Sequence, residues 1–452
     1  MKRVVVFTGL FLLAVLIIAG CGTSSSKTSS TTGGSMLMVA MGDATSDRII
    51  AFGLTVNTMT LTGGSNPTIV STPTQLEFVR NAGTFQPLVA AQIAPATYTG
   101  ATFTLSNPQV VAIDPVSHLP VQLTAALSTS TVSVTFNTPL MISGSAVEVD
   151  FDLDLANSVT ISGNTATINP VFHVSTKIVR DQDNDDFRDV RGAVTAVTAP
   201  SFTIASRQMT QLLTFATDSN TQFEGISGLS QLTAGMIVEV NAQEQSNGTL
   251  LAKRVEVEEN SDDGMEVEGF ITAETGSPAT QFMLNNEFGS GPIAALLNLL
   301  GIGTSVTVNV SSTTTFSVSD SDDINSSGLS VAFDANDIGK AQRVEAGAMH
   351  QGSFSMSGLV LNADRVRLLQ QSLGGTVSNA SGSTPGTFTL TTASDSAFAS
   401  LTGQTAITVQ VLNSTSQNVT PANGAAVRVR GLLFFSGTSK TYTLVASSIN
   451  SQ

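Results

Sequence analysis

The sequence predicts an all-β protein, with an N-terminal β-sandwich followed by three small barrel-like β repeats. Apolar and polar residues alternate with period two in many short runs, for example 131–136 and 306–310, which is typical of antiparallel strands with one buried face. A string of features also recurs three times after residue 190. The chain of 452 residues is 41% hydrophobic and 12% charged, so it can form packed cores.

Residues 1–20 predict a lipoprotein signal peptide. Two basic residues precede an apolar run from Val4 to Ile18, which is shorter than the roughly 20 residues that a membrane-spanning helix needs. Residues 18–21 read Ile-Ala-Gly-Cys and resemble the bacterial lipobox, which implies palmitate or another acyl chain on Cys21 and cleavage just before it. The alternative is an ordinary signal peptide with an incidental cysteine, but Cys21 is the only cysteine in the chain.

Residues 21–35 are nearly all Ser, Thr and Gly, and this composition predicts a flexible tether. The second residue of the mature chain would be Gly22 rather than Asp, which by similarity to enterobacterial lipoprotein sorting favours the outer membrane. We therefore expect a secreted, membrane-attached lipoprotein of the cell envelope, either facing the periplasm or exposed at the surface. We expect the protein to associate with the membrane through this lipid anchor.

Residues 36–179 predict the β-sandwich domain. They contain an Asp-Ala turn at 43–44, a Pro-Ala-Thr-Tyr segment at 95–98, an Asp-Phe-Asp strand at 150–152 and a closing Pro-Val pair at 170–171. In this order the motifs resemble a bacterial lipoprotein domain of unknown function (DUF4382). The resemblance implies a β-sandwich and no known activity.

The strand predicted from Val147 to Leu155 carries four carboxylates on one face, namely Glu148, Asp150, Asp152 and Asp154. Unpaired like charges on one strand face repel one another. They could bind a cation or act as an acid–base pair. The blander interpretation is an outer face in contact with solvent and local counterions.

The three repeats are predicted over 190–260, 265–369 and 373–452, the second with an insertion. Each begins with a glycine, an arbitrary residue, a hydrophobic residue and Ser or Thr, and each has a Phe-containing strand about ten residues later. The glycines are Gly192, Gly269 and Gly375, and the phenylalanines are Phe202, Phe282 and Phe388. Many short strands with glycines at sharp bends suit a small closed barrel. The copies resemble a second bacterial domain of unknown function (DUF5666), which recurs in tandem. The resemblance implies an oligonucleotide/oligosaccharide-binding-type barrel.

Residues 292–300 give the best helical pattern in the chain, with Pro in the first turn and Gly301 just after the last. Two interpretations remain open. The helix either offers an apolar surface to a partner or membrane, or covers the end of a barrel.

An acidic linker is predicted over 180–189. Asp181, Asp183 and Asp185 have the alternate spacing of the first ligands in a calcium loop, so they form a candidate Ca²⁺ site. The loop departs from the full pattern, because Asp186 stands where a glycine is needed and Gly192 where a bidentate glutamate is needed. The alternative is a solvated linker without an ion.

Composition excludes several function classes. The chain has 34 acidic and 19 basic residues, a formal charge of −15, and such a surface repels phosphate backbones, so no nucleic acid is expected as a partner. A single cysteine cannot form an intrachain disulfide or a cysteine-based metal site. No nucleophile elbow, phosphate-binding loop, dinucleotide fingerprint or zinc-protease motif occurs, so we expect no enzyme activity.

These observations favour a lipid-anchored, multi-domain envelope protein that acts as a non-catalytic binding or structural module. The alternative is a carbohydrate-binding or adhesive surface protein. Sugar recognition commonly uses exposed aromatic rings, whereas this chain has no Trp and two Tyr, and its 23 Phe are explained by cores. The sequence does not identify the protein or polysaccharide partner.

Overall fold

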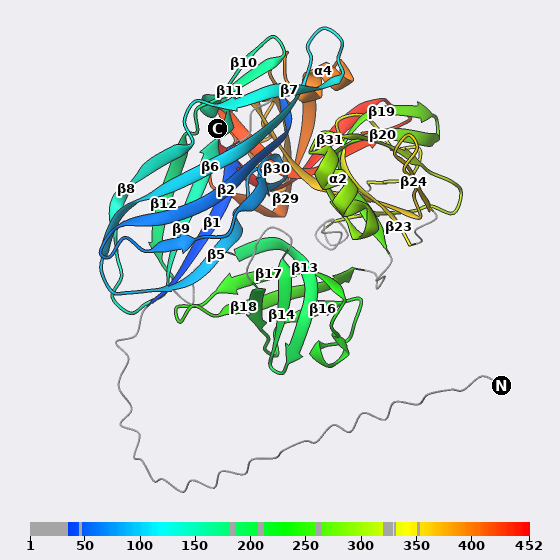
Figure 1. Ribbon diagram of the computed structural model, residues 1–452. Helices are drawn as coiled ribbons and strands as arrows, with labels where there is room; N and C mark the ends of the chain where they lie inside the picture. Colours follow the sequence, from blue (N-terminus) through cyan, green and yellow to red (C-terminus); the bar gives the residue numbers. More distant parts are fainter. Residues whose placement is uncertain are drawn as a thin grey trace, which may run out of the picture. The chain divides into compact units, whose positions relative to one another are not determined.

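Strands make up most of the chain, as the alternating sequence predicts, so the all-β fold class is confirmed (Figure 1). The computed structural model describes residues 35–44, 48–179, 186–206, 212–258, 264–319, 329, 331–349 and 353–452. The chain divides into two units, Met1–Gly33 and Gly34–Gln452, and every described residue belongs to the second.

Two sheets form the sandwich. The first has the order β12 (Phe172–Ile178), β9 (Val147–Asp154), β1 (Ser35–Ala44) and β5 (Gln86–Ile93). The second has the order β10 (Val159–Ser162), β11 (Thr165–Ile168), β7 (Pro120–Leu127), β6 (Thr97–Ile113), β2 (Ile49–Gly63) and β3 (Thr68–Val70), with β4 (Thr74–Glu77) paired to β2 and β8 (Thr131–Met141) to β6. Their inner faces share one apolar core, in which the rings of Phe103 and Phe151 meet edge to face at 4.9 Å.

Strand β1 is apolar on both faces because both faces are covered. Leu37 and Val39 point into the sandwich core, whereas Met38 and Ala40 belong to the apolar cluster of the next sheet, together with Phe187. The nearly continuous apolar sequence of this strand follows from this double burial.

The remaining strands form three further sheets, listed here in their hydrogen-bonded order. The first is β15 (Leu212–Ala216), β14 (Ser201–Ser206), β13 (Asp186–Thr198), β17 (Ile237–Glu244), β18 (Leu250–Glu258) and β16 (Gln222–Glu224). The second is β22 (Thr315–Val318), β26 (Arg365–Leu368), β23 (Arg343–Ala348), β19 (Met265–Gly276), β20 (Ala279–Ser290), β21 (Ser305–Asn309), β25 (Val360–Asn362) and β24 (Phe354–Ser355). The third is β27 (Gln370–Ser378), β28 (Gly386–Thr391), β29 (Ala406–Gln417), β31 (Thr441–Ser451) and β30 (Ala426–Ser436). We refer to them as the first, second and third barrels.

The third barrel is closed, and in the first an additional β15–β18 pairing joins the two ends of a five-strand path. The second barrel follows the same path with its last strand divided. Residues 363–364 separate β25 from β26, so that β21 pairs with β25 and β22 pairs with β26. In the first barrel, the corresponding strands β15 and β16 both pair with the single strand β18. The division explains why this sheet has eight strands instead of a simple ring.

One glycine in each barrel lies at the same place in the strand pairing. Each is opposite a valine on the neighbouring strand; the pairs are Gly192–Val238, Gly269–Val344 and Gly375–Val427. A Cβ atom at these glycines would lie 2.5, 1.8 and 2.5 Å from a backbone carbonyl oxygen of the strand on the other side. None of the three has a positive φ, so glycine is required here for space and not for conformation.

The predicted helix is α2 (Ala294–Leu300); the described residues also contain the short α-helices α1 (Leu155–Ser158) and α4 (Ala397–Thr402). Ile293 and Leu297 are buried in the apolar cluster of the second barrel, whereas Leu299 is 83% exposed. The helix therefore covers a barrel core with one side. No helix among the described residues combines the length and apolar character needed to cross a bilayer.

Candidate ligand-binding cavity

The site residues predicted from sequence motifs lie outside the described residues. They are Cys21, the candidate lipidation site, and Asp181, Asp183 and Asp185, the candidate calcium ligands. Both sites stay predictions. Within the described ranges, no group of three or more His, Cys, Asp or Glu side chains is arranged to hold a metal ion.

The acidic face of β9 is largely buried, so its interpretation as a solvent-exposed face was wrong. Glu148 is 4% exposed and Asp150 7%. The carboxylates do share one face, as the alternation predicts, but this face is covered by residues distant in the sequence. The same alternation of apolar and charged residues occurs in a strand whose charged face is covered by other parts of the chain and in a strand whose charged face is in contact with solvent.

The neighbouring strand β12 supplies partners for these carboxylates. Its register places Lys177 opposite Glu148, with 3.0 Å between Nζ and Oε2, and Ser175 opposite Asp150, to whose Oδ2 the hydroxyl donates at 3.0 Å. At the end of the strand, His173 Nε2 lies 3.2 Å from Asp154 Oδ2. Cross-strand pairs thus hold the acidic side chains in place.

A third buried carboxyl group comes from the first barrel. Glu244 at the end of β17 is 2% exposed, and its carboxyl group shares a hydrogen bond with that of Glu148. Burial raises the pKa of Glu244 to about 7, and the hydrogen bond with Glu148 and the nearby Lys177 ammonium only partly offset this rise. Burial and the Asp150 carboxylate also raise the pKa of Glu148. The Lys177 ammonium therefore acts on two buried carboxyl groups, Glu148 and Glu244, and the cluster retains protons that exposed carboxylates would release.

Beside this cluster lies a cavity of about 420 Å³ between β9, β12 and the third barrel. Its volume falls in the range of roughly 300–1,000 Å³ that is usual for small-molecule sites. The sandwich contributes the carboxyl groups of Glu148, Asp150 and Asp152 and the ring of Phe85. The third barrel contributes Arg428, Arg430 and a set of serine, asparagine and glutamine side chains.

Several polar atoms around the cavity lack partners. Asp150 Oδ1 and Arg428 Nε are both buried without a hydrogen bond. The Arg428 guanidinium acts electrostatically on Asp152, whose pKa is nevertheless raised because burial outweighs that attraction. In contrast, Arg430 donates from Nη1 to the carbonyl oxygen of Ala82 at 2.9 Å. Two residues that line the cavity, Asp150 and Arg428, therefore each carry one buried polar atom without a hydrogen bond.

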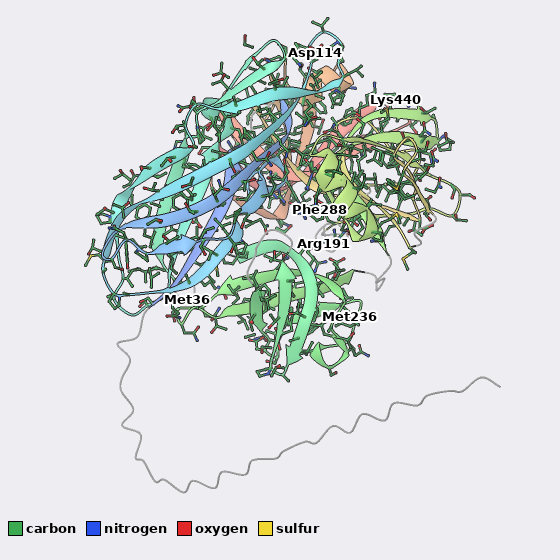
Figure 2. All side chains as sticks on the ribbon, viewed as in Figure 1. Met36, Asp114, Arg191, Met236, Phe288 and Lys440 are labelled. Atoms are coloured by element: carbon green, nitrogen blue, oxygen red, sulfur yellow. The ribbon has the colours of Figure 1, made fainter. Side chains whose placement is uncertain are left out.

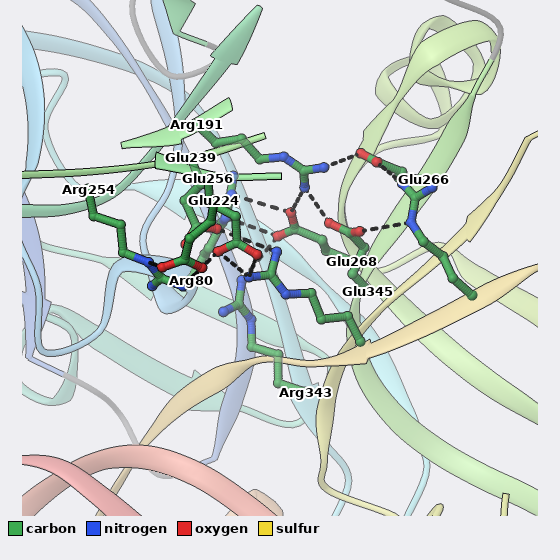
Figure 3. A network of polar contacts seen from close by, with 12 residues as sticks. Arg80, Arg191, Glu224, Glu239, Arg254, Glu256, Glu266, Glu268, Arg343 and Glu345 are labelled. Carbon is green, nitrogen blue, oxygen red and sulfur yellow. Dashed lines mark hydrogen bonds and ion pairs between the residues drawn. The ribbon is translucent and has the colours of Figure 1, made fainter. Parts of the chain in front are cut away.

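A network of ion pairs joins the first and second barrels (Figure 3). Arg191 on β13 has a side chain that is 4% exposed and contacts three carboxylates of the second barrel. Its Nη2 lies 2.7 Å from Glu266 Oε2, its Nη1 lies 3.2 Å from Glu268 Oε1, and it also pairs with Glu345. From the second barrel, Arg343 Nη2 lies 3.2 Å from Glu268 Oε2.

The sandwich also contacts this network. Arg80 Nε lies 3.0 Å from Glu268 Oε2, and the Arg80 guanidinium is stacked 5.1 Å from the ring centre of Phe288. Arg191 and Phe288 are both labelled in Figure 2. Arginines from the sandwich and from both barrels thus pair with glutamates of the second barrel.

Strand register shows that the network and the cavity use the same barrel face. Arg191 is opposite Glu239 in the first barrel, Glu268 is opposite Glu345 in the second, and the corresponding pair in the third is Gly374 and Arg428. The first two faces pair with each other, for example Arg191 with Glu268 and Arg367 with Glu239 at 3.8 Å. In the third barrel, Arg428 of this face lines the cavity instead.

Sequence reasoning missed these charged residues. Glu239, Glu345 and Arg428 each lie between two residues of a strand that carries core valines, and such alternation is equally typical of a solvated face. The sequence does contain one signal for them, because the residue that follows the first core valine of this strand is charged in all three copies.

Comparison with known proteins places one part of the chain. A solved structure of Drosophila Unr CSD456 matches with 11% sequence identity, 58% of this chain and 97% of that chain covered, and a TM-score of 0.13, which does not establish a shared fold. No curated protein matches the sequence. Residues 191–256, which extend from β13 into β18, match the family described as Domain of unknown function (DUF5666), so the first barrel is similar to that family.

Proposed function

We propose that the chain is a lipid-anchored envelope protein that acts as a non-catalytic binding module. The observation that carries this proposal is the cavity, because charged and hydrogen-bonding residues of the sandwich and the third barrel line a space large enough for a small ligand. The surrounding carboxylates are held by cross-strand partners such as Lys177 and Ser175, which suits recognition of a fixed ligand shape.

We also propose that all three barrels are copies of DUF5666 and that the sandwich belongs to DUF4382. The shared glycine position and the shared register of charged residues support the first assignment. The order of the motifs within 36–179 supports the second.

The anchoring part of the proposal rests on the lipobox-like residues 18–21 and the tether that follows. Cys21→Ala removes the only thiol that could be acylated, so we expect the variant to be soluble or to remain an uncleaved precursor. The measurement is fractionation of cells that produce the full chain, with Ser25→Ala in the tether as the matched control. Membrane association of Cys21→Ala equal to that of the control would contradict anchoring through this residue.

The second candidate function is binding of carbohydrate or adhesion to it. The favouring observation is Phe85, a cavity residue that is 37% exposed and lies near carboxylates. An aromatic face beside hydrogen-bonding groups is a common arrangement for ligands that are apolar on one side and polar at their edges.

A further inference from the structure

The cavity wall contains buried groups that a ligand would satisfy. A buried donor or acceptor without a partner costs about 1–3 kcal/mol, so few are found in native proteins. Here Asp150 of the sandwich and Arg428 of the third barrel line the same cavity, and each has one buried polar atom without a hydrogen bond, Asp150 Oδ1 and Arg428 Nε. A bound molecule with hydroxyl groups could accept from the guanidinium and donate to the carboxylate.

Ionisable groups of both signs line the cavity. Three carboxyl groups, Glu148, Asp150 and Asp152, face three cationic groups, Lys177, Arg428 and Arg430. Lys177 is paired with Glu148, and Arg430 donates to a backbone carbonyl. An anion would meet the carboxyl groups and a cation would meet the arginines, whereas a ligand without charge can hydrogen-bond to both sets.

The third barrel adds neutral hydrogen-bonding groups to the wall. Ser447 donates to Gln370 at 2.7 Å, and Asn418 donates to Asn450 at 2.6 Å. Hydroxyl and amide groups can each donate and accept, which matches a ligand that carries many hydroxyls.

Phe85 provides the apolar part of the wall. Its ring packs close to Gly42 of β1, where an added Cβ would lie 3.0 Å from two ring carbons. The backbone of β1 therefore supports one side of the ring, and the ring remains 37% exposed. A supported and partly exposed aromatic ring can stack against the C–H face of a pyranose.

We propose that this cavity binds a neutral polyhydroxylated ligand of mono- or disaccharide size. Asp150 and Arg428 hydrogen-bond to neighbouring hydroxyl groups, and Phe85 stacks against one face of the sugar ring. This inference deepens the proposed binding role and rests on it, but it is independent of the lipid anchor.

Calorimetric titration of the full chain in mild detergent tests the proposal. The probes are glucose, galactose, N-acetylglucosamine and their β-linked dimers, with glucuronate and glycine as charged and zwitterionic contrasts. We expect at least one neutral sugar to bind. Asp150→Asn and Arg428→Gln should each weaken that binding by about tenfold or more, the loss expected for a hydrogen bond to a charged group.

Asp395→Asn and Lys253→Gln are the matched controls, because both side chains are exposed and neither lines the cavity. Thermal unfolding of each variant checks that it is folded; where Asp150→Asn is not, Arg428→Gln and Phe85→Ala decide. The proposal is overturned if no neutral sugar binds at millimolar concentration, if only glucuronate or glycine binds, or if the cavity variants bind like the controls. A chain that binds sugar but does not fractionate with membranes would refute the anchor alone.

Discussion

Glu244 is a buried carboxyl group whose protonation should affect stability. Its pKa is raised to about 7, so between pH 4.5 and 7 the folded chain holds a proton that the unfolded chain releases. The stabilising contribution is complete below pH 4.5 and is lost as the pH rises through 7. We expect Glu244→Gln to reduce the loss of stability between pH 5 and pH 8 by on the order of 2 kcal/mol.

Melting temperatures at the two pH values measure this effect, with Asp395→Asn as an exposed control. The charged groups nearest to Glu244 are Glu148, Asp150 and Lys177, and all three remain in the variant. An unchanged pH dependence in Glu244→Gln would show that another group of the cluster holds the proton.

Arg191 is the residue with the largest expected effect on stability in the ion-pair network. It faces three buried carboxylates, and Arg191→Met leaves part of that charge uncompensated, so the free energy of unfolding should fall by about 3–5 kcal/mol. Arg254→Met is the matched comparison. Arg254 pairs with Glu224 and Glu256, whose side chains are 31% and 25% exposed, so the expected loss is only about 1 kcal/mol.

Urea denaturation of both variants provides the measurement. Equal losses for Arg191 and for Arg254, whose partners are more exposed, would contradict the view that burial of the ion pair decides the cost.

At the residue scale, the sequence predicts which side chains share a face but not whether that face is covered. The alternation from Val147 to Leu155 correctly places the four carboxylates together. Burial of Glu148 and Asp150 depends on Glu244 and on Arg428, which belong to distant strands. Local periodicity contains no information about such contacts.

At the scale of single strands, the shared glycines are the clearest test of the barrel geometry. A Cβ on Gly269 would lie 1.8 Å from the carbonyl oxygen of Asn285, where the β19–β20 register shifts. Gly269→Ala should therefore separate these strands and lower the free energy of unfolding by about 3 kcal/mol or more. The measurement is again urea denaturation.

Gly163→Ala separates the effect of space from that of conformation. Gly163 has a φ of 56° and no atom within 4 Å of an added Cβ, so only the left-handed backbone conformation is penalised, by about 1 kcal/mol. If Gly269→Ala costs no more than Gly163→Ala, the close approach of the strands is not what requires glycine.

The presence of the strands could be predicted because the alternation of apolar and polar residues and the recurring glycines are local features of the sequence. The division of the last strand of the second barrel into β25 and β26 was not. It depends on how residues 363–364 pair with β21 and with β23, contacts that involve distant parts of the chain. The helix α2 was predicted from its proline and glycine boundaries, but its packing side was set by the barrel core.

For the molecule as a whole, the sandwich and the barrels share apolar clusters. Ile50, Val111 and Ile113 from the outer face of the sandwich belong to the same cluster as Leu433 of the third barrel. Strands β2 and β6 are therefore apolar on both faces in these segments, as β1 is. The sequence shows this as runs of consecutive apolar residues at 49–52 and 110–113.

Shared clusters predict that the sandwich and the third barrel unfold together. Val111 is fully buried, and its side chain also lies against Gly303 of the second barrel. Val111→Asp places an unpaired charge in this shared core, so both parts should lose stability at once. Val116→Asp is the control, because Val116 is 86% exposed in a turn.

Hydrogen exchange followed by mass spectrometry reports on each part separately. In Val111→Asp, amides of β6 in the sandwich and of β30 in the third barrel should lose protection by the same factor, and calorimetry should show one unfolding transition at a lower temperature. The Val116→Asp control should match the unsubstituted chain in both measurements. If β6 loses protection while β30 keeps it, the two parts unfold independently, and the common apolar cluster does not couple them.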